Sequence, residues 1–124
     1  EPGVIPRMET SIFKADDQLV ELAEHVCRQE NPEIQVFKGR IVSGDQFVSD
    51  QDTKTRILRQ FDGYCTEMEG AAIAQAAWLN KIPFVIVRAI SDKADGSAEM
   101  DYAEFEEKAI EHTVKLLLGM MRKM

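Results

Sequence analysis

Apolar residues recur at helical spacing in four parts of the chain. The spacing predicts helices over residues 17–29, 52–61, 71–79 and 102–120. The first begins beside Asp16 and Asp17, whose side chains suit an N-cap. The second is capped by Asp52 and stops at Asp62-Gly63. The third is apolar nearly all round, a pattern typical of a buried helix.

Three runs between these helices have the composition of strands. Residues 34–43 alternate and are partly β-branched, residues 64–66 form a short extended stretch, and residues 83–90 form a continuous apolar run. A continuous run of this length is typical of a central parallel strand that is covered on both faces. Helices that alternate with strands predict an α/β fold with a parallel sheet. Three strands make a thin sheet, so either another chain completes it or the sequence belongs to a larger domain.

Acidic loops follow the predicted strands. They cover residues 43–50, 67–70 and 91–96. Parallel sheets bind ligands at the carboxyl ends of their strands, so these loops are expected to meet at one ligand site. Glu67 and Glu69 begin an apolar helix, and Arg88 and Asp92 lie in or just after an apolar strand. Charges on such elements are costly unless they are paired or used in binding, which supports a site at this edge.

Composition narrows the kind of ligand and the setting. The 124 residues suit one small domain, and 44% hydrophobic with 30% charged residues indicates a globular chain. The formal charge is −7 and the basic residues are not clustered, so nucleic acid is not an expected partner. No apolar run is long enough to span a bilayer, and the N-terminus lacks the pattern of a signal peptide. Neither Cys27 nor Cys65 has metal or redox spacing, which favours reduced thiols in a cytoplasmic protein.

Three motifs carry a resemblance to a known family. They are Ser43-Gly44-Asp45-Gln46-Phe47-Val48, Glu67-Met68-Glu69-Gly70-Ala71-Ala72 and Val87-Arg88-Ala89-Ile90-Ser91-Asp92. In order and separation they resemble the nucleoside phosphorylase superfamily, most of all the bacterial 5′-methylthioadenosine/S-adenosylhomocysteine nucleosidases. The resemblance implies a three-layer α/β sandwich with mostly parallel central strands flanked by helices. It starts near Pro6, so residues 1–124 are expected to form the C-terminal part of a single domain. The N-terminal half, with a water-activating glutamate, is expected to be absent.

The resemblance implies hydrolysis of an N-glycosidic bond without a metal or an organic cofactor. Such cleavage requires protonation of the leaving adenine, stabilisation of a cationic sugar and an aimed water molecule. Asp92 matches the general acid that protonates adenine N7, and Glu69 matches the residue that binds the ribose hydroxyls, assisted by Glu67. From spacing alone, Asp92 also suits an N-cap or loop aspartate, and the two glutamates also suit a helix N-terminus.

The remaining matches line the expected pocket. Met68 packs on the ribose, Phe47 stacks on adenine, and Val48 offers its backbone to the adenine edge. Met68 also suits ordinary core packing, and Phe47 also suits a loop aromatic tucked into the core. Ser91 is expected beside the general acid or the purine. Tyr102 matches an aromatic of the 5′-thio pocket and also suits a hydrophobic residue that opens the last helix.

Arg88 matches a residue that holds the water-activating glutamate of the missing half. Without that half, Arg88 is expected to lack its partner, which is destabilising for a charge in an apolar strand. Pro6 or Arg7 matches a residue that reaches the neighbouring subunit's pocket in this family's homodimers. The expected partners are therefore a nucleoside substrate, a second copy and the missing half as a separate chain.

Three functions stay open at this point. The first is hydrolysis of 5′-methylthioadenosine and S-adenosylhomocysteine to adenine and a 5-thioribose product, in methionine salvage and nucleoside catabolism. The isolated 124-residue chain is expected to be inactive, because it lacks the water-activating glutamate. The second is a purine nucleoside phosphorylase or another purine nucleosidase. Phosphorolysis needs an anion site, which the missing half would hold. The third is a non-catalytic remnant that binds a partner chain or adenine.

Overall fold

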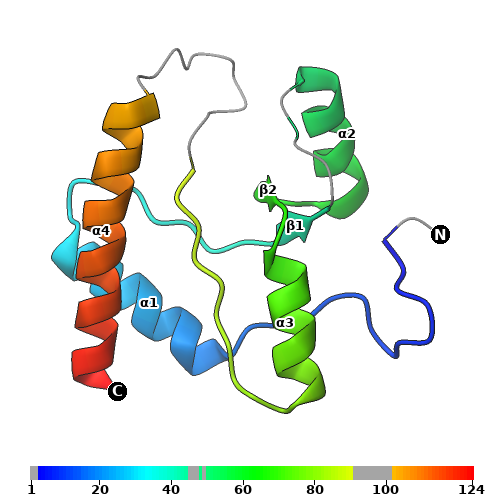
Figure 1. Ribbon diagram of the computed structural model, residues 1–124, viewed down its shortest axis with the longest axis horizontal. Coiled ribbons are helices and arrows are strands. Elements are labelled where there is room, and N and C mark those ends of the chain that lie inside the picture. The colour runs from blue at the N-terminus through cyan, green and yellow to red at the C-terminus, as the bar shows by residue number, and fades with distance from the viewer. Residues whose placement is uncertain (1–2, 45–47, 49, 91–101) are drawn as a thin grey trace.

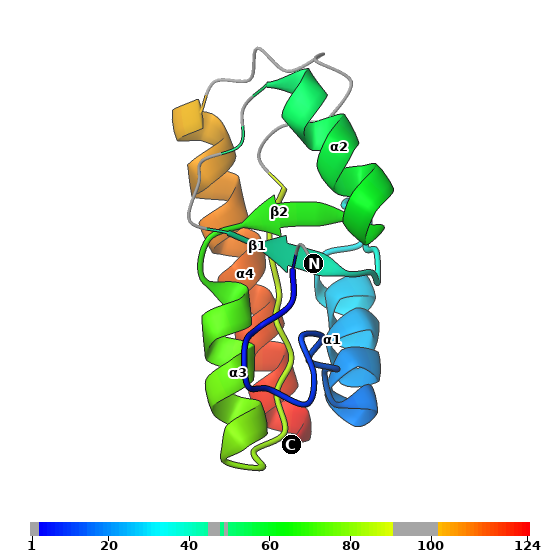
Figure 2. The same cartoon turned by 90° about the vertical axis from the view of Figure 1, so that its right-hand side faces the viewer.

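The computed structural model describes residues 3–44, 48, 50–90 and 102–124. Within these residues the elements follow in the order α1 (Asp17–Glu30), β1 (Ile41–Ser43), α2 (Gln51–Phe61), β2 (Cys65–Glu67), α3 (Gly70–Leu79) and α4 (Tyr102–Lys123) (Figure 1). The two strands lie parallel, with Ile41 opposite Cys65 and Ser43 opposite Glu67. On one side of the strands lies α2, and on the other lie α1 and α3 (Figure 2). The predicted α/β class with parallel strands is confirmed.

The hydrophobic core of the described chain lies between α1 and α4. It consists of buried apolar residues from both helices: Ala23, Val26, Leu116 and Met120. Gly119 lies where the two helices touch, and a Cβ at that position would be 2.5 Å from Val26 Cγ1. At the end of α1, the fully buried Asn31 donates a hydrogen bond from Nδ2 to the backbone oxygen of His112 in α4, at 3.0 Å. The first and last helices, α1 and α4, therefore pack closely against each other.

Aspartates begin the first two helices. The Asp16 side chain accepts a hydrogen bond from the backbone N–H of Leu19 at 3.0 Å, so it is the N-cap of α1, as predicted. The Asp50 side chain does the same for the N–H of Thr53 at 2.9 Å. The prediction that Asp52 caps this helix is therefore wrong. Asp52 lies within the first turn of α2, where its charge suits the helix dipole.

The end of α2 has an unusual backbone. Asp62 adopts the left-handed conformation, with φ of 53°, and its N–H donates to the carbonyl of Leu58 at 2.9 Å. Gly63 follows it, and a Cβ on Gly63 would lie 2.5 Å from Val42 Cγ2 in β1. The two residues thus turn the chain from α2 into β2, the one by its dihedral angles and the other by its small size.

The predicted strand over residues 83–90 is not formed, and the predicted strand over 34–43 is reduced to β1. The 83–90 segment runs lengthwise between α3 and α4 (Figures 1 and 2). One of its backbone groups, the Phe84 carbonyl, accepts from the N–H of Asp16 at 2.8 Å. Val85 packs against the core between α1 and α4. A strand requires a neighbouring strand to which it is hydrogen-bonded, and among the described residues no strand pairs with this segment.

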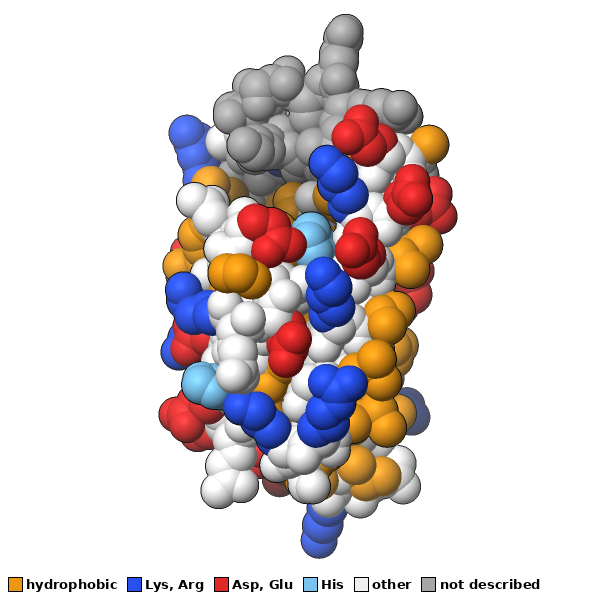
Figure 3. Space-filling view, turned by 90° about the vertical axis from the view of Figure 1, so that its left-hand side faces the viewer, with side chains coloured by type: hydrophobic (Ala, Val, Ile, Leu, Met, Phe, Trp, Pro, Cys, Tyr) orange, Lys and Arg blue, Asp and Glu red, His pale blue; other side chains and the backbone are white. Residues whose placement is uncertain are grey.

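Apolar residues of α3 and α4 are exposed in this chain. The prediction that residues 71–79 are buried is wrong, because Ile73 and Leu79 are each 57% exposed. In α4 an apolar row is also exposed beside the buried one: Ile110, Val114, Leu117 and Met121. Hydrophobic side chains gather along one edge of the molecule in Figure 3. The helices α3 and α4 therefore have apolar surface that the described residues do not cover. None of the described helices is long and apolar enough to cross a membrane.

Candidate active site

A buried carboxylate organises the turn between β2 and α3. The Glu67 side chain is 2% exposed, and the hydroxyl of Ser43 donates a hydrogen bond to its Oε1. The backbone N–H of Glu69 donates to Oε2 at 3.0 Å. The N–H of Gly70 lies within hydrogen-bonding distance of both oxygens, at 2.9 and 2.7 Å. The parallel register explains the first contact, since Ser43 and Glu67 are opposite each other in neighbouring strands.

Ser43 holds a second group of the same turn. Its Oγ accepts a hydrogen bond from the backbone N–H of Ala71 at 2.8 Å. Together, Ser43 and Glu67 therefore bind N–H groups at the start of α3 that have no partner within the helix. Gly70 makes this possible, because a Cβ there would lie 2.8 Å from Glu67 Oε1. Any larger residue would push the carboxylate away from the turn.

The charges around Glu67 favour its ionised form. Burial opposes ionisation, but the hydrogen bonds from Ser43 and from the backbone of Glu69 and Gly70, with the charge of Arg88, lower the pKa of Glu67. The guanidinium Nη1 of Arg88 lies 4.0 Å from Glu67 Oε2. Arg88 therefore has an anionic neighbour within this chain, although its expected partner was a glutamate of the missing half. Glu67 is a carboxylate at neutral pH.

The pKa of the thiol next to this cluster is shifted upward, whereas the pKa of Glu67 is lowered. Burial, with the charge of Glu67, raises the pKa of Cys65, and Arg88 opposes the rise. The thiol is therefore protonated at neutral pH and is a weak nucleophile. Cys65 and Cys27 are both free.

Glu69 and Met68 follow the buried carboxylate and are exposed. Met68 is 45% exposed. Glu69 is the N-cap residue of α3, yet its side chain makes no capping hydrogen bond. One of its oxygens, Oε2, accepts from the N–H of Met68 at 3.2 Å. The turn thus separates the two glutamates that the sequence analysis placed on one ligand. Direct contact of Glu67 with a ligand stays a prediction.

The other predicted site residues are only partly described. Arg88 is beside Glu67, and Val48 is half-buried in the loop that follows β1. Tyr102 is the first residue of α4, and its side chain is outside the described part. Phe47, Ser91 and Asp92 also lie outside the described residues. The roles assigned to these side chains, and to Met68 and Glu69, stay predictions.

Ser43 is the residue that the sequence analysis missed. It appeared there only as the first letter of a motif. The available signal was its position at the end of a predicted strand, on the same sheet edge as Glu67. A parallel pairing of those two strands would have brought the hydroxyl and the carboxylate together.

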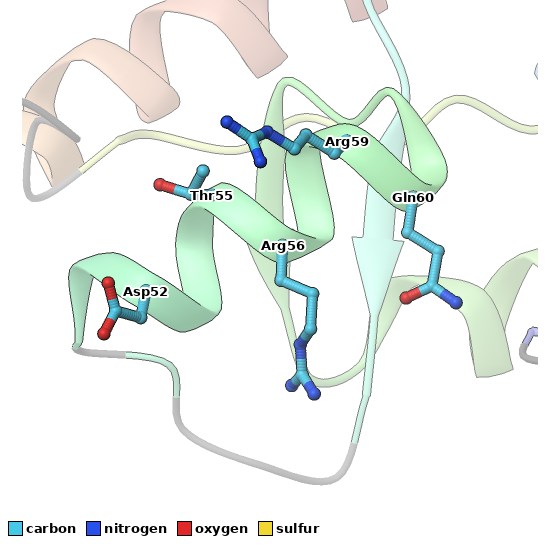
Figure 4. A pocket seen from close by; sticks show the side chains of 5 residues that line it. All are labelled: Asp52, Thr55, Arg56, Arg59 and Gln60. Atoms are coloured by element: carbon cyan, nitrogen blue, oxygen red, sulfur yellow. The ribbon is translucent and has the colours of Figure 1, made fainter.

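A hollow on α2 does not form a second site. Its lining residues belong to one helix: Asp52, Thr55, Arg56, Arg59 and Gln60. In Figure 4 the side chains of Arg56 and Gln60 extend to one side of the helix and that of Arg59 to another, so the five do not converge on a common point. The two arginines, Arg56 and Arg59, extend in different directions, so they do not form a clamp for an anion. The hollow is the uneven surface of an exposed helix.

Comparison with known proteins finds similarity over nearly the whole chain. A family model described as the phosphorylase superfamily matches residues 3–122. The 5′-methylthioadenosine/S-adenosylhomocysteine nucleosidase of Bacillus licheniformis is 40% identical over 124 residues, which are 99% of this chain and 53% of that protein. Two solved structures are also similar. The nucleosidase of the same name from Campylobacter jejuni has a TM-score of 0.87 at 34% identity, over 98% of this chain and 52% of that one.

The second structure is the futalosine hydrolase of Helicobacter pylori, with a TM-score of 0.82 at 32% identity. The similarity extends over 98% of this chain and 51% of that one. The chain therefore spans about half the length of the proteins that it matches.

Proposed function

Because the chain belongs to the phosphorylase superfamily, we propose that it is the C-terminal part of a nucleosidase domain. The whole protein hydrolyses the N-glycosidic bond of 5′-methylthioadenosine and S-adenosylhomocysteine. The observation that carries the proposal is the β2–α3 turn, in which a buried carboxylate fixes the backbone and leaves Glu69 exposed. The 40% identity to a nucleosidase of this name supports the choice of substrate.

The reaction breaks the bond between the sugar carbon C1′ and the adenine nitrogen N9. The bonding electrons go to adenine, which takes a proton at N7 from Asp92. Glu69 accepts hydrogen bonds from the ribose hydroxyls, and its charge favours the cationic sugar of the transition state. A water molecule adds its oxygen to C1′ and gives its proton to a glutamate outside this chain. The products are adenine and a 5-thioribose, the second of which enters methionine salvage.

Further residues of the chain complete the pocket in this proposal. Phe47 stacks on adenine, the Val48 backbone meets the adenine edge, and Ser91 orients the base. Met68 packs on the ribose, and its exposure leaves the side chain available for that contact. Tyr102 lines the 5′ pocket at the start of α4.

Arg88 holds the water-activating glutamate from one side. Its position 4.0 Å from Glu67 suits this role, because Glu67 limits where the guanidinium can lie. The remaining half of the domain covers the exposed apolar faces of α3 and α4, whether it belongs to the same polypeptide or to a separate one. It also supplies strand neighbours for residues 83–90. Burial of these faces is worth about 25 cal/mol per Å², so it stabilises the association of the two halves. The assembled protein is a cytoplasmic homodimer.

The likeness to a futalosine hydrolase supports a second candidate substrate. A phosphorylase of the same superfamily is a third possibility. The experiment therefore has to separate substrates and has to compare water with phosphate as the attacking group.

The test joins this chain behind the N-terminal half of the Bacillus licheniformis relative in one polypeptide, here called the completed protein. We expect it to release adenine from 5′-methylthioadenosine without phosphate, and we expect the 124-residue chain alone to release none. Asp92→Asn and Glu69→Gln should each lower the rate by at least about a hundredfold. Glu21→Gln, on the exposed side of α1, is the matched control and should keep full activity.

Three results would contradict this proposal. A strict requirement for phosphate would indicate a phosphorylase. Cleavage of futalosine in place of 5′-methylthioadenosine would change the substrate. Full activity of Asp92→Asn would remove Asp92 as the general acid.

A further inference from the structure

The N–H groups at the start of α3 are capped by side chains from outside the helix. A helix N-cap residue commonly uses its own side chain to bind the first free N–H groups. Glu69 occupies this position but makes no such bond. The groups are bound by residues from the two strands, namely Glu67 at the end of β2 and Ser43 at the end of β1. The carboxylate of Glu69 is therefore not needed for the helix.

Ser43 contacts both Glu67 and the start of α3. Its hydroxyl donates to Glu67 Oε1 and accepts from the N–H of Ala71 at 2.8 Å. One contact lies before Glu69 in the chain and the other after it. The backbone on both sides of Glu69 is thus tied to β1, a different strand from the one that leads into the turn. The Glu69 side chain itself stays exposed.

We propose that Ser43 is a positioning residue that fixes Glu69 for its contact with the ribose hydroxyls. The inference rests on the proposed function for the role of Glu69. Ser43 does not touch the substrate in this arrangement. It acts through Glu67 and the first turn of α3, and it keeps the Glu69 carboxylate exposed and aimed at the ribose. Removal of the hydroxyl leaves the Ala71 N–H without this acceptor and Glu67 without the hydrogen bond from Ser43.

The first experiment tests the positioning without any assay of activity. Hydrogen exchange is measured on the 124-residue chain and on its Ser43→Ala and Ser43→Thr variants. We expect the amide of Ala71 to exchange at least tenfold faster in Ser43→Ala and to regain protection in Ser43→Thr, which keeps a hydroxyl. Ser11→Ala is the matched control, because Ser11 also accepts a backbone hydrogen bond, from Ile5 at 2.8 Å, in another part of the chain.

The second experiment uses the completed protein and two substrates, 5′-methylthioadenosine and its 2′-deoxy analogue. If Ser43 acts through Glu69, Ser43→Ala should lower kcat/KM about tenfold on the first substrate. It should lower kcat/KM less on the second, which lacks one of the two hydroxyls for Glu69 to bind. A purely structural role would lower both values equally. Ser43→Thr should restore most of the activity, and Ser11→Ala should not change either value.

The outcomes separate this inference from the proposed function. Unchanged exchange of the Ala71 amide in Ser43→Ala would overturn the positioning role, whatever the activity. Equal losses on the two substrates would also overturn it. Absence of adenine release from the completed protein with Ser43 intact would overturn the proposed function, and with it the part of the inference that concerns ribose.

Discussion

Replacement of Gly119 by alanine sets helix propensity against helix packing. Alanine is favoured over glycine in a helix interior by about 1 kcal/mol. The new Cβ would lie 2.5 Å from Val26 Cγ1 and 3.3 Å from Glu30 Cγ in α1. Ordinary contact between carbon atoms is about 3.5–4.0 Å. The new Cβ would therefore be roughly 1 Å too close to Val26 Cγ1.

Val26 cannot move aside at low cost. It is 1% exposed, and a β-branched side chain in a helix has one strongly preferred rotamer. The helices must separate instead, which loosens the contacts of Leu116 and Met120 with α1. Overpacking of this kind costs about 1–3 kcal/mol. After the gain in helix propensity is subtracted, we expect Gly119→Ala to lower the free energy of unfolding by up to about 2 kcal/mol.

Urea unfolding of the chain, followed by circular dichroism, measures this change. A double-mutant cycle with Val26→Ala tests its cause. Val26→Ala alone removes the clashing atom and leaves a cavity, at a cost of about 2 kcal/mol. In that background the methyl group of Gly119→Ala has room, so the same substitution should stabilise the chain by about 1 kcal/mol.

The change of sign is the decisive result. Gly44→Ala is a suitable control, since a Cβ at Gly44 meets nothing within 4 Å. If Gly119→Ala stabilised the chain in the parent background, or if the two substitutions were additive, the close approach of α1 and α4 would be refuted.

Two further predictions concern the helix starts. Asp16→Ala removes the acceptor for the Leu19 N–H and should lower the free energy of unfolding by about 1 kcal/mol. Asp16→Asn keeps an acceptor and should retain most of the stability. Equal urea midpoints for all three proteins would contradict the cap. The folded-state pKa of Glu67 is lowered from its ordinary value of 4.5, so its stabilisation is present above that pH and is lost as pH falls through the folded value. Unfolding free energy should therefore drop below about pH 4.5, and Glu67→Gln, already weaker at pH 7, should show a smaller drop; parallel pH profiles would refute it.

Local signals predicted the helices well. The apolar spacing and the aspartate before it placed α1 almost to the residue. The cap of α2 was predicted wrongly as Asp52, because Asp50 and Asp52 both precede the helix pattern. Only the structure decides between them, through the hydrogen bond from the Thr53 N–H to Asp50. Such an ambiguity is expected where two good capping residues lie two positions apart.

Features that depend on distant partners were harder to predict. The 83–90 run has the composition of a central strand, but composition does not supply the neighbour to which a strand must bond. The same holds for residues 71–79, whose apolar side chains are exposed because the described chain has nothing that covers them.

Part of the candidate site was visible in the motifs and part was not. The sequence indicated that Glu67 and Glu69 flank a turn into a helix, which is confirmed. It did not indicate that one carboxylate would be buried and the other exposed. That difference arises from Ser43, which is 24 positions away and reaches Glu67 through the parallel register.

The Asp62-Gly63 pair has a consequence for substitution at the end of α2. An Asp-Gly pair at such a place suggests that the glycine provides the left-handed residue. Here the aspartate has the positive φ, with a conformational strain of about 1 kcal/mol. The glycine is required because Val42 leaves no room for a Cβ. The order of the two residues therefore cannot be reversed: glycine at 62 would relieve strain, but aspartate at 63 would push Val42 of β1 away from the start of β2.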